Sequence, residues 1–329
     1  MDIARPFLLA VLLLAAAPAR ADAPSLAVPV DCAIGRECFI QNFVDDDPGP
    51  GAGDYACGRL TYDDHKGTDF RVPDLGAMRR GVAVTAAAAG RVTRVRDGMD
   101  DVSIRDPGKG DIAGREAGNA VVVEHGDGWE TQYSHLRKGS IAVRPGDTVE
   151  AGQKLGLIGL SGNTEFPHVD FAVRRDGRTI DPFVGPEPAA ACGGSRAPLW
   201  GEAARTALAY QATGVLNAGF AGEAPVDAKA RDGGYAGAAP GRDAPVLAFW
   251  GDLFGGQAGD QLSLRIHGPD GREIKRGTAT LPKPLAALFL AVAANRPAAG
   301  WPPGTYSGRL SVTRNGAVVA DAERRIEIR

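Results

Sequence analysis

The chain has 329 residues, of which 44% are hydrophobic and 23% are charged, and its formal net charge is -3. A chain of this length normally contains more than one domain. Acidic and basic residues are mixed along it without a basic stripe, which argues against a nucleic-acid-binding protein.

Residues 1–21 are typical of a secretory signal peptide. Arg5 provides the positive start, an apolar run follows at 7–17, and Ala19-Arg20-Ala21 resembles a cleavage site. The apolar run is too short to span a bilayer, although a short membrane anchor is the alternative. No later stretch is long or apolar enough to span one. We therefore expect no stable membrane insertion, and a periplasmic or secreted protein.

All four cysteines, Cys32, Cys38, Cys57 and Cys192, lie after this segment. An even number in an oxidising compartment predicts disulfides, but four cysteines allow three pairings. We favour Cys32–Cys38 as a local loop and Cys57–Cys192 as a clasp. A second metal site is the alternative, and the spacings fit it poorly.

Residues 22–57 form an N-terminal disulfide-bearing segment with few periodic apolar positions. The acidic run at 45–47 is followed by prolines and glycines, which favours a solvated turn. A calcium site is the alternative, but the spacing matches no EF-hand loop.

Residues 58–185 predict an antiparallel β domain, because short apolar or alternating runs are separated by turn glycines. Helical periodicity is almost absent. The stretch 96–119 is too long for a hairpin turn, so it either lines a site or is a surface excursion. The predicted strands lie at 82–84, 90–95, 120–123, 129–133, 155–158 and 168–173.

Residues 186–243 are rich in Pro, Ala and Gly and predict a linker with a short helix near 201–210. Alternating apolar positions return in 244–329, and Asn315-Gly316 is a strong hairpin signal. The apolar stretch 285–294 is ambiguous, and we favour a strand because its neighbours are strands. The fold class is therefore all-β, with a small immunoglobulin-like sandwich at the C-terminus, which is a candidate for contacting a protein partner.

Three of the 5 histidines lie close to carboxylates or turn glycines: His65 with Asp69, His135, and His168 with Asp170. Imidazole and carboxylate are the ligands that a catalytic zinc prefers, and further histidines can move protons.

Local geometry favours a shared site. Positions i and i+2 of a strand face the same side, so His168 and Asp170 point together while Val169 enters the opposite layer. His65 and Asp69 must meet through a turn, and Gly67 between them would allow the backbone to bend.

The motifs HxxxD at 65–69, YxHL at 133–136 and GxSGxxxxPHxxF at 159–171 resemble the lysostaphin-type zinc endopeptidases of family M23. The resemblance covers 58–185 and implies an antiparallel metallopeptidase fold. It implies that His65 and Asp69 bind Zn²⁺, and that His135 and His168 are catalytic. The family's third ligand, the second His of HxH, is replaced here by Asp170.

A carboxylate binds zinc at a distance similar to that of imidazole, so Asp170 alters the site rather than erasing it. A more electron-rich metal acidifies its water less, which predicts a higher pH optimum or tolerance for manganese. The stretch Thr164-Glu165-Phe166 also departs from the small residues typical of the family at this place, which predicts a different substrate wall.

The resemblance implies hydrolysis of peptide cross-links in bacterial peptidoglycan. The alternative is a catalytically weak or inactive regulator of other cell-wall hydrolases, and Asp170 is the residue that raises it. An iron-dependent oxygenase also uses HxD with a distant His, but the surrounding turns do not support that fold. We expect Tyr133 and Asn119 to contact the substrate, with a structural role as the alternative, and His125 to be structural.

Overall fold

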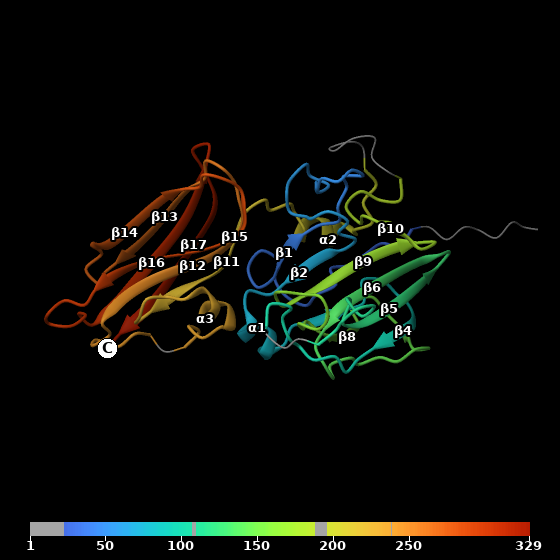
Figure 1. Ribbon diagram of the computed structural model, residues 1–329, viewed down its shortest axis with the longest axis horizontal. Coiled ribbons are helices and arrows are strands. Elements are labelled where there is room, and N and C mark those ends of the chain that lie inside the picture. Colours follow the sequence, from blue (N-terminus) through green and yellow to red (C-terminus); the bar gives the residue numbers. More distant parts are fainter. Residues whose placement is uncertain (1–22, 107–109, 188–195, 238) are drawn as a thin grey trace, which may run out of the picture.

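The structure is a computed structural model, and it describes residues 23–106, 110–187, 196–237 and 239–329. The predicted signal peptide and Cys192 lie outside these residues. Two β regions lie side by side, with short helices at their junction (Figure 1).

The N-terminal region contains an eight-stranded antiparallel sheet. Its order is β1 (Phe39–Asn42), β2 (Thr68–Arg71), β9 (His168–Arg175), β6 (Trp129–Leu136), β5 (Asn119–Gly126), β4 (Gly90–Arg96) and β7 (Thr148–Val149), and β10 (Arg178–Ile180) pairs with β9. A smaller sheet joins β3 (Ala83–Thr85) to β8 (Lys154–Leu157). The strands predicted for 58–185 are confirmed.

Alternation in β2 and β9 separates the core from the candidate site. Phe70, Val169 and Phe171 are fully buried in the apolar core. The intervening side chains face the other side of the sheet, where Asp69 lies opposite Asp170 across the strand pair. The predicted placement of Val169 in the opposite layer is confirmed.

The C-terminal region is a sandwich of two antiparallel sheets. One contains β11 (Gly214–Ala221), β12 (Val246–Gly256) and β15 (Leu285–Asn295). The other contains β14 (Glu273–Thr280), β13 (Gln261–His267), β16 (Gly304–Arg314) and β17 (Ala317–Ile328). Residues 285–294 are a strand, as predicted, and positive φ angles of 51° and 81° at Asn315 and Gly316 form the hairpin turn.

The segment predicted to be a linker is more structured than expected. Its residues 214–221 are strand β11, which pairs with β12 and completes one sheet of the sandwich. Alternate positions of β11 are buried, but glycines and alanines fill many of them, so the strand resembles a low-complexity connector in sequence. Helix α2 (Glu202–Ala207) lies in the predicted helical stretch.

Two further short helices were not predicted and lie at the junction of the two regions (Figure 1). They are α1 (Leu75–Arg80) and α3 (Asp227–Asp232). Asp74 caps α1 by accepting the N–H of Ala77, and its other oxygen accepts a bond of 2.6 Å from Asn217 of β11. This carboxylate therefore connects the N-terminal region to the sandwich.

Two smaller expectations concern the N-terminal segment. The Cys32–Cys38 disulfide is present, whereas the pairing of Cys57 with Cys192 lies outside the described residues. In the acidic run, Asp45 accepts the N–H groups of Asp47 and Gly53, as in the predicted solvated turn. No helix within the described ranges is long and apolar enough to cross a membrane.

Candidate metal centre

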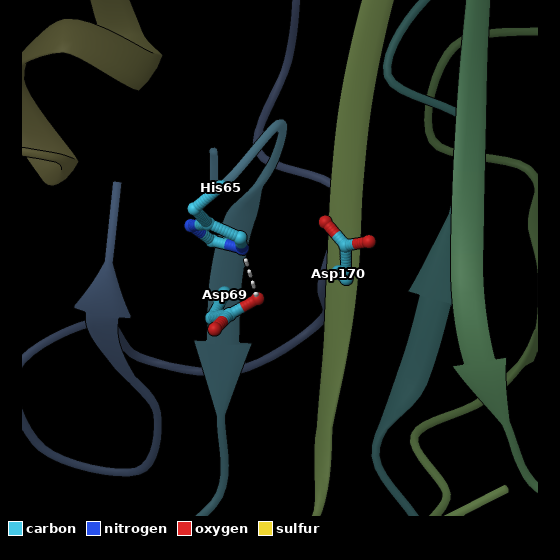
Figure 2. Close-up of side chains that lie close together, drawn as sticks. All are labelled: His65, Asp69 and Asp170. Atoms are coloured by element: carbon cyan, nitrogen blue, oxygen red, sulfur yellow. Dashed lines mark ion pairs between the residues drawn. The ribbon is translucent and has the colours of Figure 1, made fainter. Parts of the chain in front are cut away.

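The predicted ligands His65, Asp69 and Asp170 lie together on one face of the sheet (Figure 2). His65 ends the turn before β2, Asp69 lies on β2, and Asp170 lies opposite it on β9. One donor atom from each residue lies within 4.8 Å of the others. His65 Nε2 is 3.3 Å from Asp69 Oδ1.

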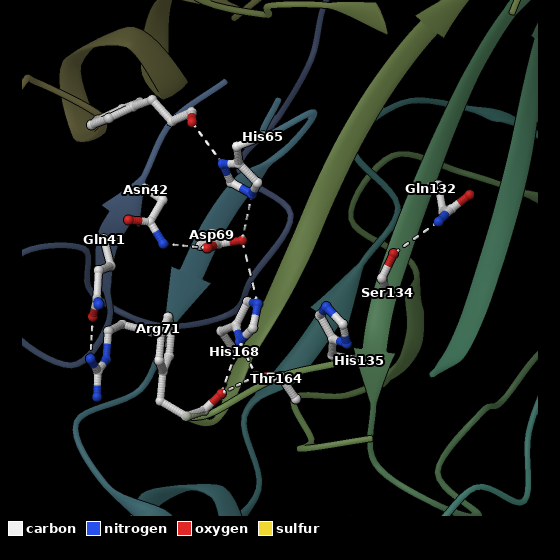
Figure 3. A network of polar contacts seen from close by, with 12 residues as sticks. Gln41, Asn42, His65, Asp69, Arg71, Gln132, Ser134, His135, Thr164 and His168 are labelled. Atoms are coloured by element: carbon white, nitrogen blue, oxygen red, sulfur yellow. Dashed lines mark hydrogen bonds and ion pairs between the residues drawn. The ribbon is translucent and has the colours of Figure 1, made fainter. Parts of the chain in front are cut away.

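Backbone carbonyls orient all three histidines of the site, whose rings are labelled in Figure 3. The Nδ1 atoms of His65, His135 and His168 lie 2.7 to 2.9 Å from the carbonyl oxygens of Phe43, Ser161 and Phe166, respectively. A carbonyl oxygen can only accept, so Nδ1 carries the proton in each ring and the neutral ring holds its lone pair on Nε2. That tautomer suits both metal binding and proton transfer at Nε2.

Asp69 lies at the centre of these contacts. Its Oδ1 is 3.3 Å from His65 Nε2 and 3.4 Å from His168 Nε2, and its Oδ2 accepts a bond of 2.7 Å from Asn42. The Oδ1 atoms of Asp69 and Asp170 are both buried and accept no hydrogen bond. Buried carboxylate oxygens of this kind are costly unless a cation or a donor satisfies them.

Gly67 provides the space that Asp170 occupies. A Cβ on Gly67 would lie 1.7 Å from Asp170 Oδ1. The sequence suggested a backbone bend at this glycine, but Gly67 is not among the residues with positive φ, and Asp64 is. Its role is therefore close approach. With two unsatisfied oxygens and an oriented imidazole nearby, these residues fit a divalent metal.

The electrostatics describe a site that protons neutralise when no metal is bound. Burial opposes the charged form of His65, but Asp69 outweighs it and raises the pKa of His65 to about 9. Burial likewise disfavours ionised Asp69, but the two imidazoles hold its pKa well below its usual range. Burial and the neighbouring Asp69 raise the pKa of Asp170 to about 6.

His135 and His168 lie next to each other beside this group. Their ring centroids are 4.7 Å apart, and both side chains are buried. His135 has a φ of 62°, an unusual conformation for a residue other than glycine. Strained backbone at a polar site is consistent with a constrained functional side chain.

The site opens into a cavity of about 320 Å³. Tyr62 was not predicted to line it, and its ring stacks on the His65 ring at 4.4 Å between centroids. Thr164, Glu165 and Phe166, predicted to form part of the substrate wall, do line the cavity, and Phe166 packs on His168 at 4.7 Å. Ile104 belongs to the long stretch 96–119, which therefore lines the site at that point.

The prediction that Tyr133 and Asn119 contact the substrate is wrong. Both are fully buried and neither lines the cavity. The Tyr133 hydroxyl accepts the N–H of Ala87, and Asn119 bonds to the backbone of Met99 and Leu136. These contacts support the site's loops and leave no surface for a substrate.

The ring nitrogens of His125 support a structural role. Nδ1 lies 2.8 Å from the carbonyl oxygen of Ala89, and Nε2 lies 2.9 Å from Thr131 Oγ1. This agrees with the structural role expected from the sequence.

Comparison with known proteins adds independent evidence. The sequence model described as peptidase family M23 matches residues 63–182. The peptidoglycan DD-endopeptidase ShyB of Vibrio cholerae is 35% identical over 117 residues, which are 36% of this chain and 22% of the relative. The DD-carboxypeptidase/endopeptidase Mpg of Neisseria meningitidis is 29% identical over 120 residues, 36% of this chain and 22% of the relative.

The chain thus spans about a fifth of the length of these curated relatives. A crystal structure of a zinc-containing peptidase from Vibrio cholerae is 27% identical and covers 43% of this chain and 39% of that chain, with a TM-score of 0.28. The family match coincides with the segment that carries the ligands and the histidines. Residues 63–182 of this chain are a domain of peptidase family M23.

Proposed function

We propose that the chain is a zinc endopeptidase that hydrolyses peptide cross-links of bacterial peptidoglycan. His65, Asp69 and Asp170 would hold the zinc, which supplies Lewis acidity for activating water and polarising the scissile carbonyl. The observation that carries the proposal is the pair of buried carboxylate oxygens without hydrogen-bond partners, from Asp69 and Asp170, facing an oriented His65. The relatives named as peptidoglycan endopeptidases support the substrate class.

The other two histidines of the site, His168 and His135, would supply proton transfer and stabilisation of the developing negative charge, respectively. Nδ1 of His168 is held by the Phe166 carbonyl oxygen, so its Nε2 accepts a proton from the attacking water and later delivers it to the leaving amine. His135, in its protonated form, stabilises the negative charge that develops on the carbonyl oxygen. We assign the roles in this order, and their exchange would leave the rest of the proposal unchanged.

An inactive regulator of other cell-wall hydrolases is the second candidate. The observation that favours it is Asp170, because a second carboxylate reduces the Lewis acidity of a bound zinc. However, the ligand atoms still converge and both histidines keep the tautomer required for catalysis.

The experiment that separates the two uses the purified full chain loaded with zinc and incubated with cross-linked peptidoglycan. The enzyme releases soluble muropeptides, a chelator stops the release, and His65→Ala abolishes it together with metal binding. His135→Ala is the matched control, because it should retain the metal and lose the release. Absence of release by the zinc-loaded chain, combined with stimulation of a wall amidase, would support the regulator.

We also infer that the protein acts outside the cytoplasm, in the periplasm or after secretion. The features that support this are the signal-like sequence at 1–21, the Cys32–Cys38 disulfide and relatives named for peptidoglycan cleavage. Detection of the mature chain in a periplasmic extract, with the first 21 residues removed, would test it.

A further inference from the structure

Arg71 is a buried cation beside the candidate metal centre. It ends β2, two residues after Asp69, and its side chain faces the same side of the sheet (Figure 3). Only 5% of the residue is exposed. It lines a second cavity, of about 710 Å³, between the catalytic sheet and the C-terminal sandwich.

Arg71 forms no ion pair with a carboxylate of the described residues, although the charges of Asp252, Asp69 and Asp74 act on it from a greater distance. Nη1 donates to Gln41 Oε1 and Nε donates to the carbonyl oxygen of Val72. The guanidinium lies 4.4 Å from the centroid of the Phe166 ring. In the described part of the chain, no carboxylate lies within ion-pair distance of it, and Nη2 makes no hydrogen bond.

Other cations of this cavity are paired. Arg105 forms an ion pair with Glu165, and Arg231 lies 3.3 Å from Asp252. Burial lowers the pKa of Arg71 to about 10, so the guanidinium remains charged at neutral pH. A buried charge without a direct ion pair is costly even when more distant carboxylates offset part of the cost, and its retention in a cavity wall points to a ligand that supplies a carboxylate in direct contact.

The two cavities meet at Phe166. Its ring carries Arg71 on one side and also packs against His168. Glu165 and Phe166 line both cavities. Positions i and i+2 of a strand are about 7 Å apart, so an extended peptide that reaches Asp69 can place a carboxylate about two residues further along, at Arg71.

We propose that Arg71 anchors a substrate subsite for a peptide carboxylate, in the cavity that the sandwich closes from the opposite side. The proposal rests on the proposed function and names the chemistry that fixes the substrate's position. Asp252 of β12 and Ala286 of β15 contribute the opposite wall, which gives the sandwich a part in specificity. Stem peptides of peptidoglycan carry free carboxylates, and Arg binds carboxylate with strong, directional hydrogen bonds.

The test measures binding of a ligand that contains no cross-link to cleave. Full-chain protein is titrated with an uncross-linked muropeptide tetrapeptide and with the same peptide after all its carboxylates have been converted to carboxamides. We expect the wild type to prefer the carboxylate form by about tenfold or more, as for one charge-assisted hydrogen bond. Arg71→Gln should bind both forms equally, and Arg71→Lys should keep part of the preference.

Arg105→Gln is the matched control, because Arg105 lines the same cavity but already has Glu165 as a partner. It should retain the wild-type preference within about twofold, as expected for an exposed ion pair. Arg71→Gln should also unfold at a temperature no lower than that of the wild type, because it removes an uncompensated buried charge.

Equal binding of the two peptides by the wild type, or an undiminished preference in Arg71→Gln, would overturn the proposal. A large fall in the unfolding temperature of Arg71→Gln with its preference intact would show a purely structural role. A protein that is not an enzyme would give a different result from a protein without this subsite. Cross-linked dimers would remain uncleaved while the wild type still distinguished carboxylate from carboxamide.

Discussion

The sandwich and the N-terminal sheet that carries the candidate metal centre, here called the catalytic sheet after the proposed function, both bury carboxylates but satisfy them differently. Asp260 of the sandwich is fully buried, and its oxygens accept bonds of 2.7 and 2.8 Å from Arg314 and one of 2.8 Å from the N–H of Gln257. Asp69 and Asp170 of the catalytic sheet each leave a buried Oδ1 without a donor.

The difference separates a structural carboxylate from one available to a ligand. A satisfied buried ion pair such as Asp260–Arg314 stabilises one arrangement of the chain, and losing one partner destabilises the fold. The two carboxylates repel each other in the metal-free protein, where protonated histidines offset the repulsion, and a bound cation offsets it in the metal-loaded protein. Arg71 and Arg314 show the same contrast for cations.

The largest effect should come from removing a ligand on the catalytic side. His65→Ala should lower the rate of muropeptide release by about a thousandfold, or about 4 kcal/mol of transition-state stabilisation, because the metal is lost. Release assays with measured zinc content check this. Asp260→Ala is the control on the sandwich side, and it should keep its zinc at temperatures where it remains folded. If His65→Ala kept the zinc content and the release rate of the wild type, the two regions would not differ in the way described.

The stability of the metal-free protein should depend on pH through the catalytic side. The pKa of His65 is raised from 6.5 to about 9, so protonated His65 stabilises the fold fully below pH 6.5. That contribution is lost as pH rises from 6.5 to 9, and it amounts to up to about 3 kcal/mol. Denaturant unfolding in the presence of a chelator, measured from pH 6.5 to 9, gives the slope of the free energy of unfolding against pH. His65→Gln should flatten it, and an unchanged slope in that variant would assign the titration to another group.

Charge removal should act in opposite directions in the two regions. Asp260→Asn should lower the free energy of unfolding by about 2 kcal/mol, because it weakens charged hydrogen bonds to Arg314. Asp170→Asn in the metal-free protein should leave it unchanged or raise it, since the repulsion with Asp69 disappears. Chemical denaturation of both variants in a chelator tests this at neutral pH. Equal destabilisation would show that both carboxylates are structural.

The smallest expected effect is on zinc affinity, and it tests whether Asp170 needs the space that Gly67 leaves free. Gly67→Ala should weaken zinc binding by about tenfold, because the new Cβ would lie 1.7 Å from Asp170 Oδ1 and displaces this ligand oxygen by about 1 Å or more. Competition with a chromogenic chelator measures the affinity. Gly110→Ala is the matched control, because a Cβ there would meet no atom within 4 Å. Equal affinities for the two variants would mean that Asp170 does not bind the metal.

The sequence was sufficient where function depends on local spacing. The i, i+2 relation of His168 and Asp170 and the short separation of His65 and Asp69 correctly predicted one shared face. The turn glycines and alternating apolar residues located most strands of both regions.

Residues whose partners are distant in the sequence could not be predicted. Asn42, which donates to Asp69, lies in a segment that looks like loop, and only the pairing of β1 with β2 brings it there. Tyr133 belongs to a recognisable motif, but strand alternation directs it into the core. Arg71 looks like an ordinary strand-end arginine until the sandwich closes the cavity around it.

The most direct test of the account is anomalous scattering at the zinc edge from crystals of the zinc-loaded full chain. We predict one peak within about 2.0 to 2.2 Å of His65 Nε2 and of carboxylate oxygens from both Asp69 and Asp170. No peak at this position, or a bound zinc whose ligands exclude Asp170, would contradict the account.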